Sequence, residues 1–219
     1  MKYKNDMIII REFTPEEFTL FSTLFENENV TRYLPYKTPE EYKEMFDKAL
    51  ADYEAGPFSR WGIFNTQTDD FVGMCLARVF LDNPEQVEIG YTLGENYWGK
   101  GLGTEVCKAL VDYCYSLHPK KDIVAVTDLD NIGSQKVLLK SGFNRIENLA
   151  REDRELAYFR EGINLCLILQ TKDREFPSCG GVAKIQGIFD GVVLHTPTSN
   201  FFAIKHFIYQ IIYHNLQEL

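Results

Sequence analysis

The sequence predicts an α/β fold in which a mixed sheet carries helices on its faces. The first observation is the order of apolar segments, whose periodicities follow β-α-α-β-β-β-α-β-α-β-β along the 219 residues. The second is a polar turn between two segments rich in aromatic and β-branched residues, which is typical of an antiparallel hairpin. The third is a glycine-rich loop that joins a strand to a helix.

The N-terminal part is predicted to be one strand followed by two helices. Residues 7–13 are apolar and β-branched, and Thr14-Pro15-Glu16-Glu17 then supplies a cap residue, a first-turn proline and a capping-box glutamate. The same device recurs at Thr38-Pro39-Glu40-Glu41, before a segment with one apolar helical face that Gly56-Pro57 ends.

The central part is predicted to hold the hairpin and the loop. Residues 60–66 and 71–81 flank the turn at 67–70, and residues 87–93 form the next strand. Gly99-Lys100-Gly101-Leu102-Gly103 then opens a helix whose apolar stripe includes Cys107 and Cys114. Burial explains these two cysteines without a nucleophilic role.

The last predicted elements are a strand at 122–129, a helix at 131–141 capped by Gly142, and strands at 143–148 and 163–170. We expect one domain over residues 1–171 and an extension of unknown role over residues 172–219. The apolar segment 201–216 is interrupted by Lys205, so a membrane span is not expected. A helix at a subunit contact and an appended segment without its own function both stay open.

Composition narrows the functional classes. A net charge of −9 argues against nucleic-acid binding and mildly favours a cationic partner. Five cysteines without a Cys-x-x-Cys pair, together with a polar N-terminus, indicate a cytoplasmic protein without a disulfide framework. The histidines and cysteines form no recognisable ligand cluster, so no metal is expected.

The glycine-rich loop is a candidate phosphate site, because the first N–H groups of a helix are unpaired and its dipole attracts anions. Residues 94–100 match Gly-x-x-x-x-Gly-Lys, but Gly101 stands where a nucleotide hydrolase needs Ser or Thr for magnesium. Gly99-x-Gly101-x-x-Thr104 lacks the last glycine of a dinucleotide fingerprint. Both nucleotide interpretations are therefore weak.

A second motif lies one helix and one strand further on, at Asn131-x-x-Ser134 followed by Leu138-x-Lys140-x-Gly142-Phe143. With the loop, it makes residues 7–170 resemble the GNAT N-acetyltransferases, most closely the ribosomal-protein-alanine acetyltransferase type. The loop of that family reads Arg or Gln, two residues, Gly, one residue, then Gly or Ala. Here Gly101 and Gly103 fill the glycine positions, and Trp98 stands in the Arg or Gln position.

The resemblance implies a mostly antiparallel sheet with a V-shaped splay between two central strands. It also implies acetyl-CoA as cosubstrate, no metal, and direct attack by an amine in a ternary complex of a monomer or homodimer. The amine would belong to a protein N-terminus or a small molecule. The expected cofactor contacts are Ile89, Gly90, Tyr91, Thr92, Leu93, Trp98, Gly99, Lys100, Gly101, Leu102, Gly103, Thr104, Asn131, Ser134 and Lys140.

Glu88, Asn131 and Ser134 are the candidate catalytic residues. An ammonium group with a pKa near ~10 must lose a proton before it attacks a carbonyl. Glu88 is the candidate base, although a solvated strand carboxylate is an equal alternative. Many members of the family carry a tyrosine acid at the position of Leu138, so this chain needs another proton donor. Ser134 is the candidate donor to the departing sulfur, and Asn131 is the candidate for orienting the cofactor.

The helices between Phe18 and Tyr53 are expected to form the acceptor wall. Glu26, Glu28, Tyr33 and Tyr36 are its candidate contacts for a cationic amine. A protein that binds acyl-CoA as a sensor, or a GNAT fold that has lost turnover, is the alternative function.

Overall fold

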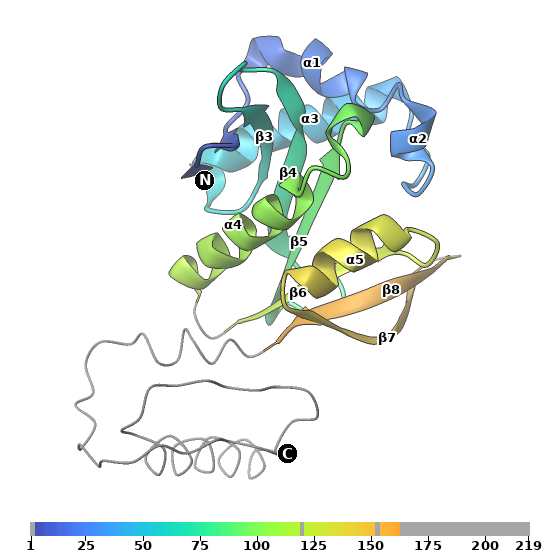
Figure 1. Cartoon of the computed structure of the whole chain (residues 1–219). Helices are drawn as coiled ribbons and strands as arrows, with labels where there is room; N and C mark the ends of the chain where they lie inside the picture. Colours follow the sequence, from blue (N-terminus) through green and yellow to red (C-terminus); the bar gives the residue numbers. More distant parts are fainter. Residues whose placement is uncertain (1–2, 119–120, 152–153, 163–219) are drawn as a thin grey trace, which may run out of the picture. The chain divides into compact units, whose positions relative to one another are not determined.

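An eight-stranded sheet with the order β1-β2-β3-β4-β5-β6-β8-β7 organises the chain (Figure 1). The computed structural model describes residues 3–118, 121–151 and 154–162, so the predicted strand 163–170 and the extension 172–219 lie outside the described residues. The strands are β1 (Tyr3–Lys4), β2 (Ile8–Arg11), β3 (Arg60–Asn65), β4 (Phe71–Val79), β5 (Gln86–Leu93), β6 (Asp122–Asp128), β7 (Phe143–Arg151) and β8 (Arg154–Glu161). Among the described strands only β5 and β6 run parallel, which confirms a mostly antiparallel sheet.

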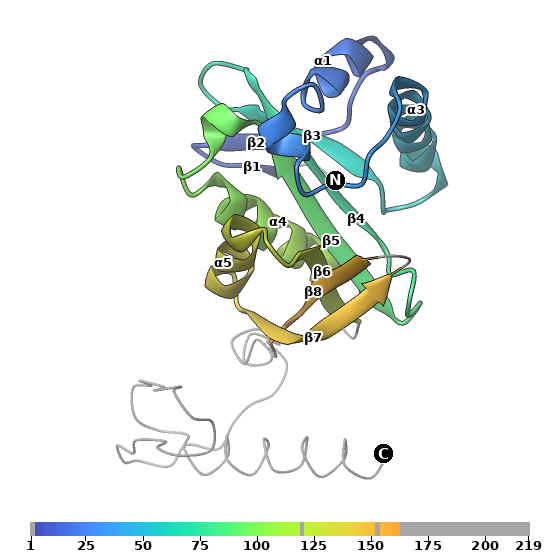
Figure 2. The ribbon, with the colours of Figure 1, turned by 90° about the vertical axis from the view of Figure 1, so that its right-hand side faces the viewer.

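Helices cover both faces of the sheet, as predicted. The helical elements are η1 (Pro15–Glu17), α1 (Phe18–Thr23), α2 (Glu28–Thr31), α3 (Pro39–Ala55), η2 (Glu95–Tyr97), α4 (Leu102–Leu117) and α5 (Ile132–Lys140). Figure 2 shows α3 on one side of the strands and α4 and α5 on the other. Within the described ranges, no helix combines the length and the apolar character needed to cross a membrane.

Two cores fill the spaces between the layers. On the α3 face, the rings of Phe13, Phe21 and Phe46 pack against each other with centroids 5.2–5.6 Å apart. On the α4 face, Val106 and Leu110 are fully buried against the other side of the sheet. Successive side chains of each central strand therefore point alternately into the aromatic core on the α3 face and the aliphatic core on the α4 face.

The local signals in the sequence correspond closely to the elements that form. Both capping boxes are present, with Thr38 N donating to Glu41 Oε2 over 2.7 Å and Thr14 N donating to Glu17 Oε2 over 2.9 Å. Gly142 adopts a φ of 92° after α5, as expected of a helix C-terminal cap. The short elements β1 and α2 and the strand β8 were not predicted.

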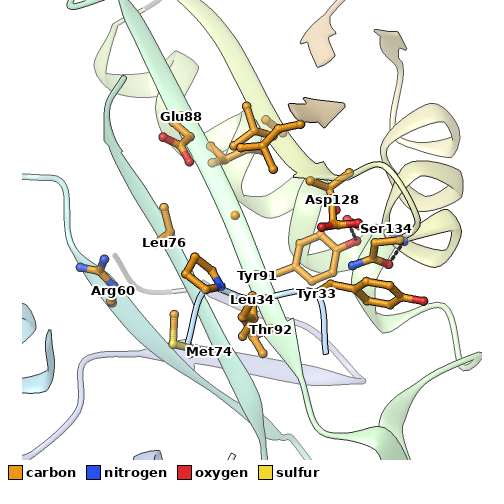
Figure 3. Close-up of a pocket in the computed structure, with 18 of the residues that line it drawn as sticks. Tyr33, Leu34, Arg60, Met74, Leu76, Glu88, Tyr91, Thr92, Asp128 and Ser134 are labelled. Carbon is orange, nitrogen blue, oxygen red and sulfur yellow. Dashed lines mark hydrogen bonds between the residues drawn. The ribbon is translucent and has the colours of Figure 1, made fainter. Parts of the chain in front are cut away.

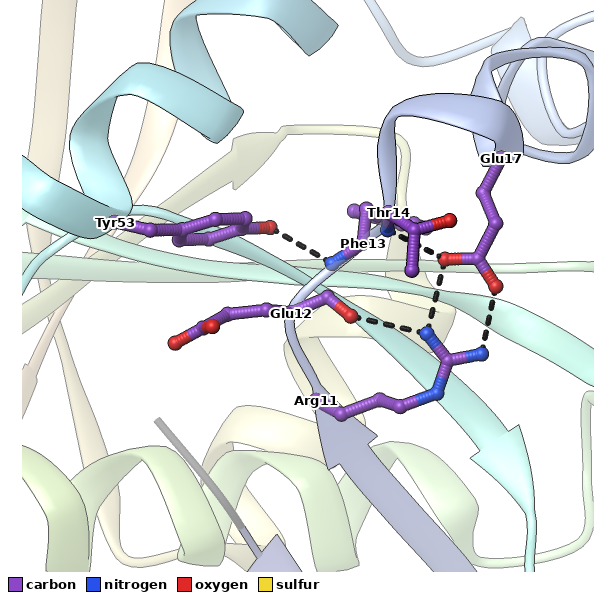
Figure 4. Close-up of polar contacts among 6 residues, drawn as sticks. All are labelled: Arg11, Glu12, Phe13, Thr14, Glu17 and Tyr53. Atoms are coloured by element: carbon purple, nitrogen blue, oxygen red, sulfur yellow. Dashed lines mark hydrogen bonds and ion pairs between the residues drawn. The ribbon is translucent and has the colours of Figure 1, made fainter.

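Glu17 also joins the end of β2 to the helix that follows (Figure 4). Its two carboxylate oxygens accept hydrogen bonds of 2.7 and 2.9 Å from the Arg11 guanidinium, which also lies 3.7 Å from the Phe64 ring centroid. Nearby, Tyr53 accepts a hydrogen bond from Phe13 N and donates one to Arg60 O. These contacts fix the start of α1 and the position of Arg60 on β3.

We expect Glu17→Gln to lower the free energy of unfolding at pH 7 by about 1 kcal/mol, since one cap hydrogen bond and a partly buried ion pair weaken. Hydrogen bonds from Arg11 hold the pKa of Glu17 below its ordinary value. The stabilisation is therefore present above that ordinary value, near ~4.3, and is lost as pH falls through the lower folded-state value.

Urea titrations at pH 7 and at acidic pH should show the difference between the parent protein and Glu17→Gln shrinking with acidification. Glu16→Gln, which changes an exposed neighbouring carboxylate, is the matched control. An equal difference at both pH values would contradict the role of the Glu17 charge.

Candidate active site

The sheet opens between β5 and β6, where the expected V-shaped splay is confirmed. The two strands pair only at Gln86–Asp122, Val87–Ile123 and Glu88–Val124. Beyond Glu88, β5 continues to pair with β4 as far as Leu93, whereas β6 pairs with β8. One backbone edge of β5 from Ile89 onward therefore has no strand neighbour in the described part of the chain.

A cavity of about 320 Å³ occupies this opening and is lined from both faces of the sheet (Figure 3). On the α3 face its walls include Phe25, Tyr33, Leu34, Tyr42, Met45, Arg60, Met74, Leu76, Arg78 and Glu88. On the α4 and α5 face they include Tyr91, Cys107, Asn131, Ser134 and Leu138. A ligand in the splay can therefore meet groups from both sides at once.

The glycine-rich loop presents a row of free amides at the start of α4. Gly99 and Gly101 adopt φ values of 72° and 79°, a left-handed backbone that glycine accepts readily. The N–H groups of residues 99–103 have no acceptor among the described residues, and residues 98–101 are exposed. Five free donors at the positive end of a 16-residue helix form a favourable site for an anion.

Two contacts position this loop beside the cavity. The Trp98 indole N–H donates to Leu93 O over 2.8 Å, which ties the loop to the end of β5 while the residue stays 45% exposed. At Gly103 an added Cβ would lie 3.3 Å from Val137 and 3.4 Å from Tyr91, so α4 approaches α5 and β5 closely there. Trp98 thus has a structural role in holding the loop against the end of β5.

On α5, a hydrogen-bonded set of polar groups borders the cavity. Asn131 Oδ1 accepts a hydrogen bond of 3.0 Å from Ser134 N and so caps the helix. Ser134 Oγ lies 3.5 Å from the Tyr91 hydroxyl (Figure 3). Burial raises the pKa of Tyr91 to about 12, against a smaller opposing effect of Ser134, so its hydroxyl stays protonated at neutral pH.

Glu88 lies against an arginine rather than in solvent. Only 5% of the residue is exposed, and its oxygens accept hydrogen bonds of 2.9 Å each from Arg78 Nε and Nη2 on β4. The alternative of a solvated strand carboxylate is therefore wrong. Glu88 instead belongs to a bidentate ion pair on the α3 wall of the cavity.

The described cysteines behave as core residues. Cys107 touches the cavity but is fully buried, and burial raises its pKa to about 11; burial raises that of Cys114 to about 12. Both thiols are protonated at neutral pH and so are poor nucleophiles. Within residues 3–118, 121–151 and 154–162, no group of three or more His, Cys, Asp or Glu side chains is placed to hold a metal ion.

The sequence model of the acetyltransferase (GNAT) domain matches residues 7–144, more than half of the chain. The chain belongs to the GNAT acetyltransferase family. It is similar to the uncharacterized N-acetyltransferase YoaA of Bacillus subtilis, with 29% identity over 145 residues that span 65% of this chain and 82% of the relative. It is also similar to the probable N-acetyltransferase YjcK of Bacillus subtilis, with 28% identity over 152 residues, 69% of this chain and 83% of the relative.

Solved structures show the same fold at low identity. The ribosomal-protein-S5-alanine acetyltransferase from Vibrio fischeri aligns with a TM-score of 0.63 and 14% identity, over 74% of this chain and 96% of that chain. The spermidine N-acetyltransferase from Vibrio cholerae, in complex with CoA and spermine, aligns with a TM-score of 0.59 and 16% identity, over 71% and 95%. These similarities show that the sheet with its splay and its glycine-rich loop has the GNAT fold.

The GNAT fold brings part of the predicted site into the cavity. Its walls include the predicted residues Glu88, Ile89, Gly90, Tyr91, Thr92, Asn131 and Ser134. The predicted cofactor contacts outside the cavity lining are Leu93, Trp98, Gly99, Lys100, Gly101, Leu102, Gly103, Thr104 and Lys140. Lys100 and Lys140 are exposed, and Lys140 lies in the last turn of α5, where it also favours the helix dipole.

Part of the predicted acceptor wall lines the cavity. Tyr33 lines the cavity, as do Phe25, Tyr42 and Met45 from the same helical region. Glu26, Glu28 and Tyr36 are exposed and lie outside the lining. Sequence reasoning missed Arg60, Arg78 and the Tyr91 hydroxyl, although the hairpin register would have placed Arg78 opposite Glu88.

We expect Arg78→Met to lower the free energy of unfolding by about 2 kcal/mol, because it leaves the Glu88 carboxylate buried without its partner. Arg78→Met combined with Glu88→Gln should be less destabilised than the sum of the two single changes, since the double variant buries no unpaired charge. Urea denaturation of all four proteins measures the coupling. Strict additivity would show that the ion pair contributes nothing.

Proposed function

We propose that the protein transfers the acetyl group of acetyl-CoA to an amine by direct attack in a ternary complex. The observation that carries this proposal is the cavity in the splay, which has a protonated tyrosine on one wall, a buried carboxylate on the other, and free helix amides beside it. Membership of the GNAT family supports the cofactor. Solved relatives described as complexes with CoA support it further.

The loop and β5 are the proposed cofactor site. The amides of residues 99–103 would hold the pyrophosphate at the start of α4, and exposed Lys100 and Lys140 would add charge near phosphate. The edge of β5 from Ile89 to Leu93, which has no neighbouring strand, would form hydrogen bonds with the amides of the pantetheine arm. The arm would thus take the place of a neighbouring strand. The thioester would then lie between Glu88 and Ser134.

The proposed reaction removes two protons from the acceptor nitrogen and delivers one proton to the coenzyme A sulfur. The ammonium of the acceptor loses a proton to Glu88, directly or through water, and the neutral nitrogen attacks the thioester carbonyl. A β5 amide near Ile89 or Gly90 stabilises the oxyanion, and the carbon–sulfur bond then breaks. The thiolate takes a proton from Ser134, which the Tyr91 hydroxyl resupplies, while Asn131 keeps the start of α5 in position. The nitrogen, cationic after attack, loses its second proton through water as the amide forms, and that proton restores the Tyr91 hydroxyl.

The acceptor amine belongs to a protein N-terminus or to a small molecule. The loop sequence Tyr97-Trp98-Gly99-Lys100-Gly101 supports placing the chain near the ribosomal-protein-alanine acetyltransferases. That placement would favour a protein N-terminus. A cavity of about 320 Å³ that also has to receive the thioester favours a small acceptor instead.

The Arg78–Glu88 ion pair favours a second candidate function, an acyl-CoA-binding sensor. Two hydrogen bonds from Arg78 engage both carboxylate oxygens of Glu88, so an acceptor ammonium has to compete with the guanidinium for them. A panel of amines assayed for thiol release, alongside calorimetric titration with acetyl-CoA, separates the two functions. Release that depends on an amine supports the transferase, and tight binding without release supports the sensor.

For the transferase, we expect Glu88→Gln and Tyr91→Phe each to lower kcat about 100-fold, since each removes one proton-transfer group. Mass detection of the acetylated product with thiol release measures the rate, and calorimetry should show the acetyl-CoA affinity of Glu88→Gln within a few-fold of the parent. Glu85→Gln, an exposed carboxylate just before β5, is the control. Unchanged kcat in either site variant would remove that residue from the mechanism.

We expect Gly101→Val to weaken acetyl-CoA binding at least about tenfold. A β-branched residue is strained at a φ of 79°, so the loop must change conformation and turn its amides. The free energy of unfolding should fall by about 1–3 kcal/mol from this backbone strain, with no added clash because nothing beyond the chain neighbours lies within 4 Å of the added Cβ. Lys100→Ala keeps every amide and should weaken binding less. Equal affinity in Gly101→Val and the parent protein would place the pyrophosphate elsewhere.

A further inference from the structure

The charge of the cavity lining is opposite in sign to that of the whole protein. Its cationic residues are Lys37, Arg60, Arg78, Arg151 and Arg154, and its carboxylates are Glu88 and Asp128. The described lining therefore carries five cationic groups against two carboxylates, in a chain whose formal net charge is −9. The cavity lining thus has an excess of positive charge, whereas the protein as a whole has an excess of negative charge.

Four of these five cationic groups have carboxylate partners within the described residues. The pairs are Lys37–Glu41 at 3.5 Å, Arg78–Glu88 at 2.9 Å, Arg154–Asp128 at 2.5 Å and Arg151–Asp82. Arg60 forms no ion pair with a described residue, and its Nε is buried without an acceptor among them. Both lining carboxylates, in turn, already bind arginine.

Arg60 belongs to the α3 face of the sheet. It stands opposite Leu76 on β4, which stands opposite Gly90 on β5, so a short path across the sheet connects it to the splay. Figure 3 shows Arg60 beside Leu76, on the opposite side of β5 from Tyr91 and Ser134. The free amides at the start of α4 belong to the other face, so Arg60 lies on the acceptor side of the cavity.

An unpaired guanidinium in this position is costly. Burial lowers the pKa of Arg60 and the positive charge of Arg78 lowers it further, against smaller opposing effects of Asp52 and Glu88. The Nε of Arg60 is buried although the residue as a whole is partly exposed, and a partly desolvated cation without a partner is a candidate ligand contact. The Tyr53 hydroxyl, which donates to Arg60 O over 2.6 Å, nevertheless holds this strand position in place.

We propose that Arg60 binds a carboxylate group of the acceptor, so that the amine acetylated in this site belongs to a small amino carboxylate. This inference rests on the proposed acetyl transfer. The planar guanidinium fork matches a carboxylate in a bidentate arrangement. A polyamine, by contrast, would bring a second cation to a lining whose described carboxylates are already paired.

The test measures acetylation rates of ω-amino acids of increasing chain length and of the corresponding carboxamides. Each rate is corrected for the fraction of the amine that is neutral at the assay pH. In the parent protein we expect kcat/KM for the best carboxylate to exceed that of its carboxamide roughly 10- to 100-fold. Arg60→Met should bring this ratio close to one, and Arg60→Lys should restore part of it. Arg160→Met, which removes an exposed arginine outside the lining, is the matched control.

A binding measurement keeps the test independent of turnover. Calorimetry of the CoA-loaded protein should show the N-acetylated amino carboxylate binding more tightly than its carboxamide, with Arg60→Met abolishing the preference. If this holds while no amine is acetylated, the transferase proposal fails and the carboxylate site stands. If carboxamides, polyamines or peptide amines are acetylated in preference, the transferase stands and the Arg60 inference is overturned. No preference in either measurement also overturns it.

Discussion

The loss of pairing between β5 and β6 after Glu88 is the constraint on which the rest of the site depends. A parallel pair that continued along β6 would fill the space that the cavity occupies and would satisfy the free edge of β5. Pairing of β4 with the full length of β5 and of β8 with β6 keeps both arms of the opening ordered. The site is thus a gap between two well-paired halves of one sheet.

This gap explains why the two walls differ chemically. A strand alternates its side chains between faces, so Glu88, Gly90 and Thr92 belong to the α3 face while Ile89 and Tyr91 belong to the α4 face. The carboxylate and the arginines therefore meet a ligand from one side, and the Tyr91–Ser134 pair meets it from the other. The base and the acid that we propose would then stand on opposite walls of a thioester in the gap, one near the attacking amine and the other near the departing thiolate.

The sequence contained the local features of this design but not the long-range ones. The capping boxes, the hairpin turn and the left-handed glycines were predictable because each depends on neighbouring residues. Strand β8 was not, since Arg154, Arg160 and Glu161 obscure its alternation and only Ala157 and Phe159 are buried. Its strand character comes from pairing with β6 and β7, which no local pattern encodes.

Arg60 shows that the net charge of the whole protein does not predict the charge of the cavity. A net charge of −9 favours a cationic partner, yet charge in a narrow cavity is determined by the few side chains that line it and by which of them are already paired. Coulomb interactions strengthen as the local dielectric falls, so one unpaired guanidinium inside outweighs many screened carboxylates outside. The acidic surface therefore says little about the acceptor. The pairing of the lining side chains is the better guide to its charge, and it favours an anionic group beside the amine.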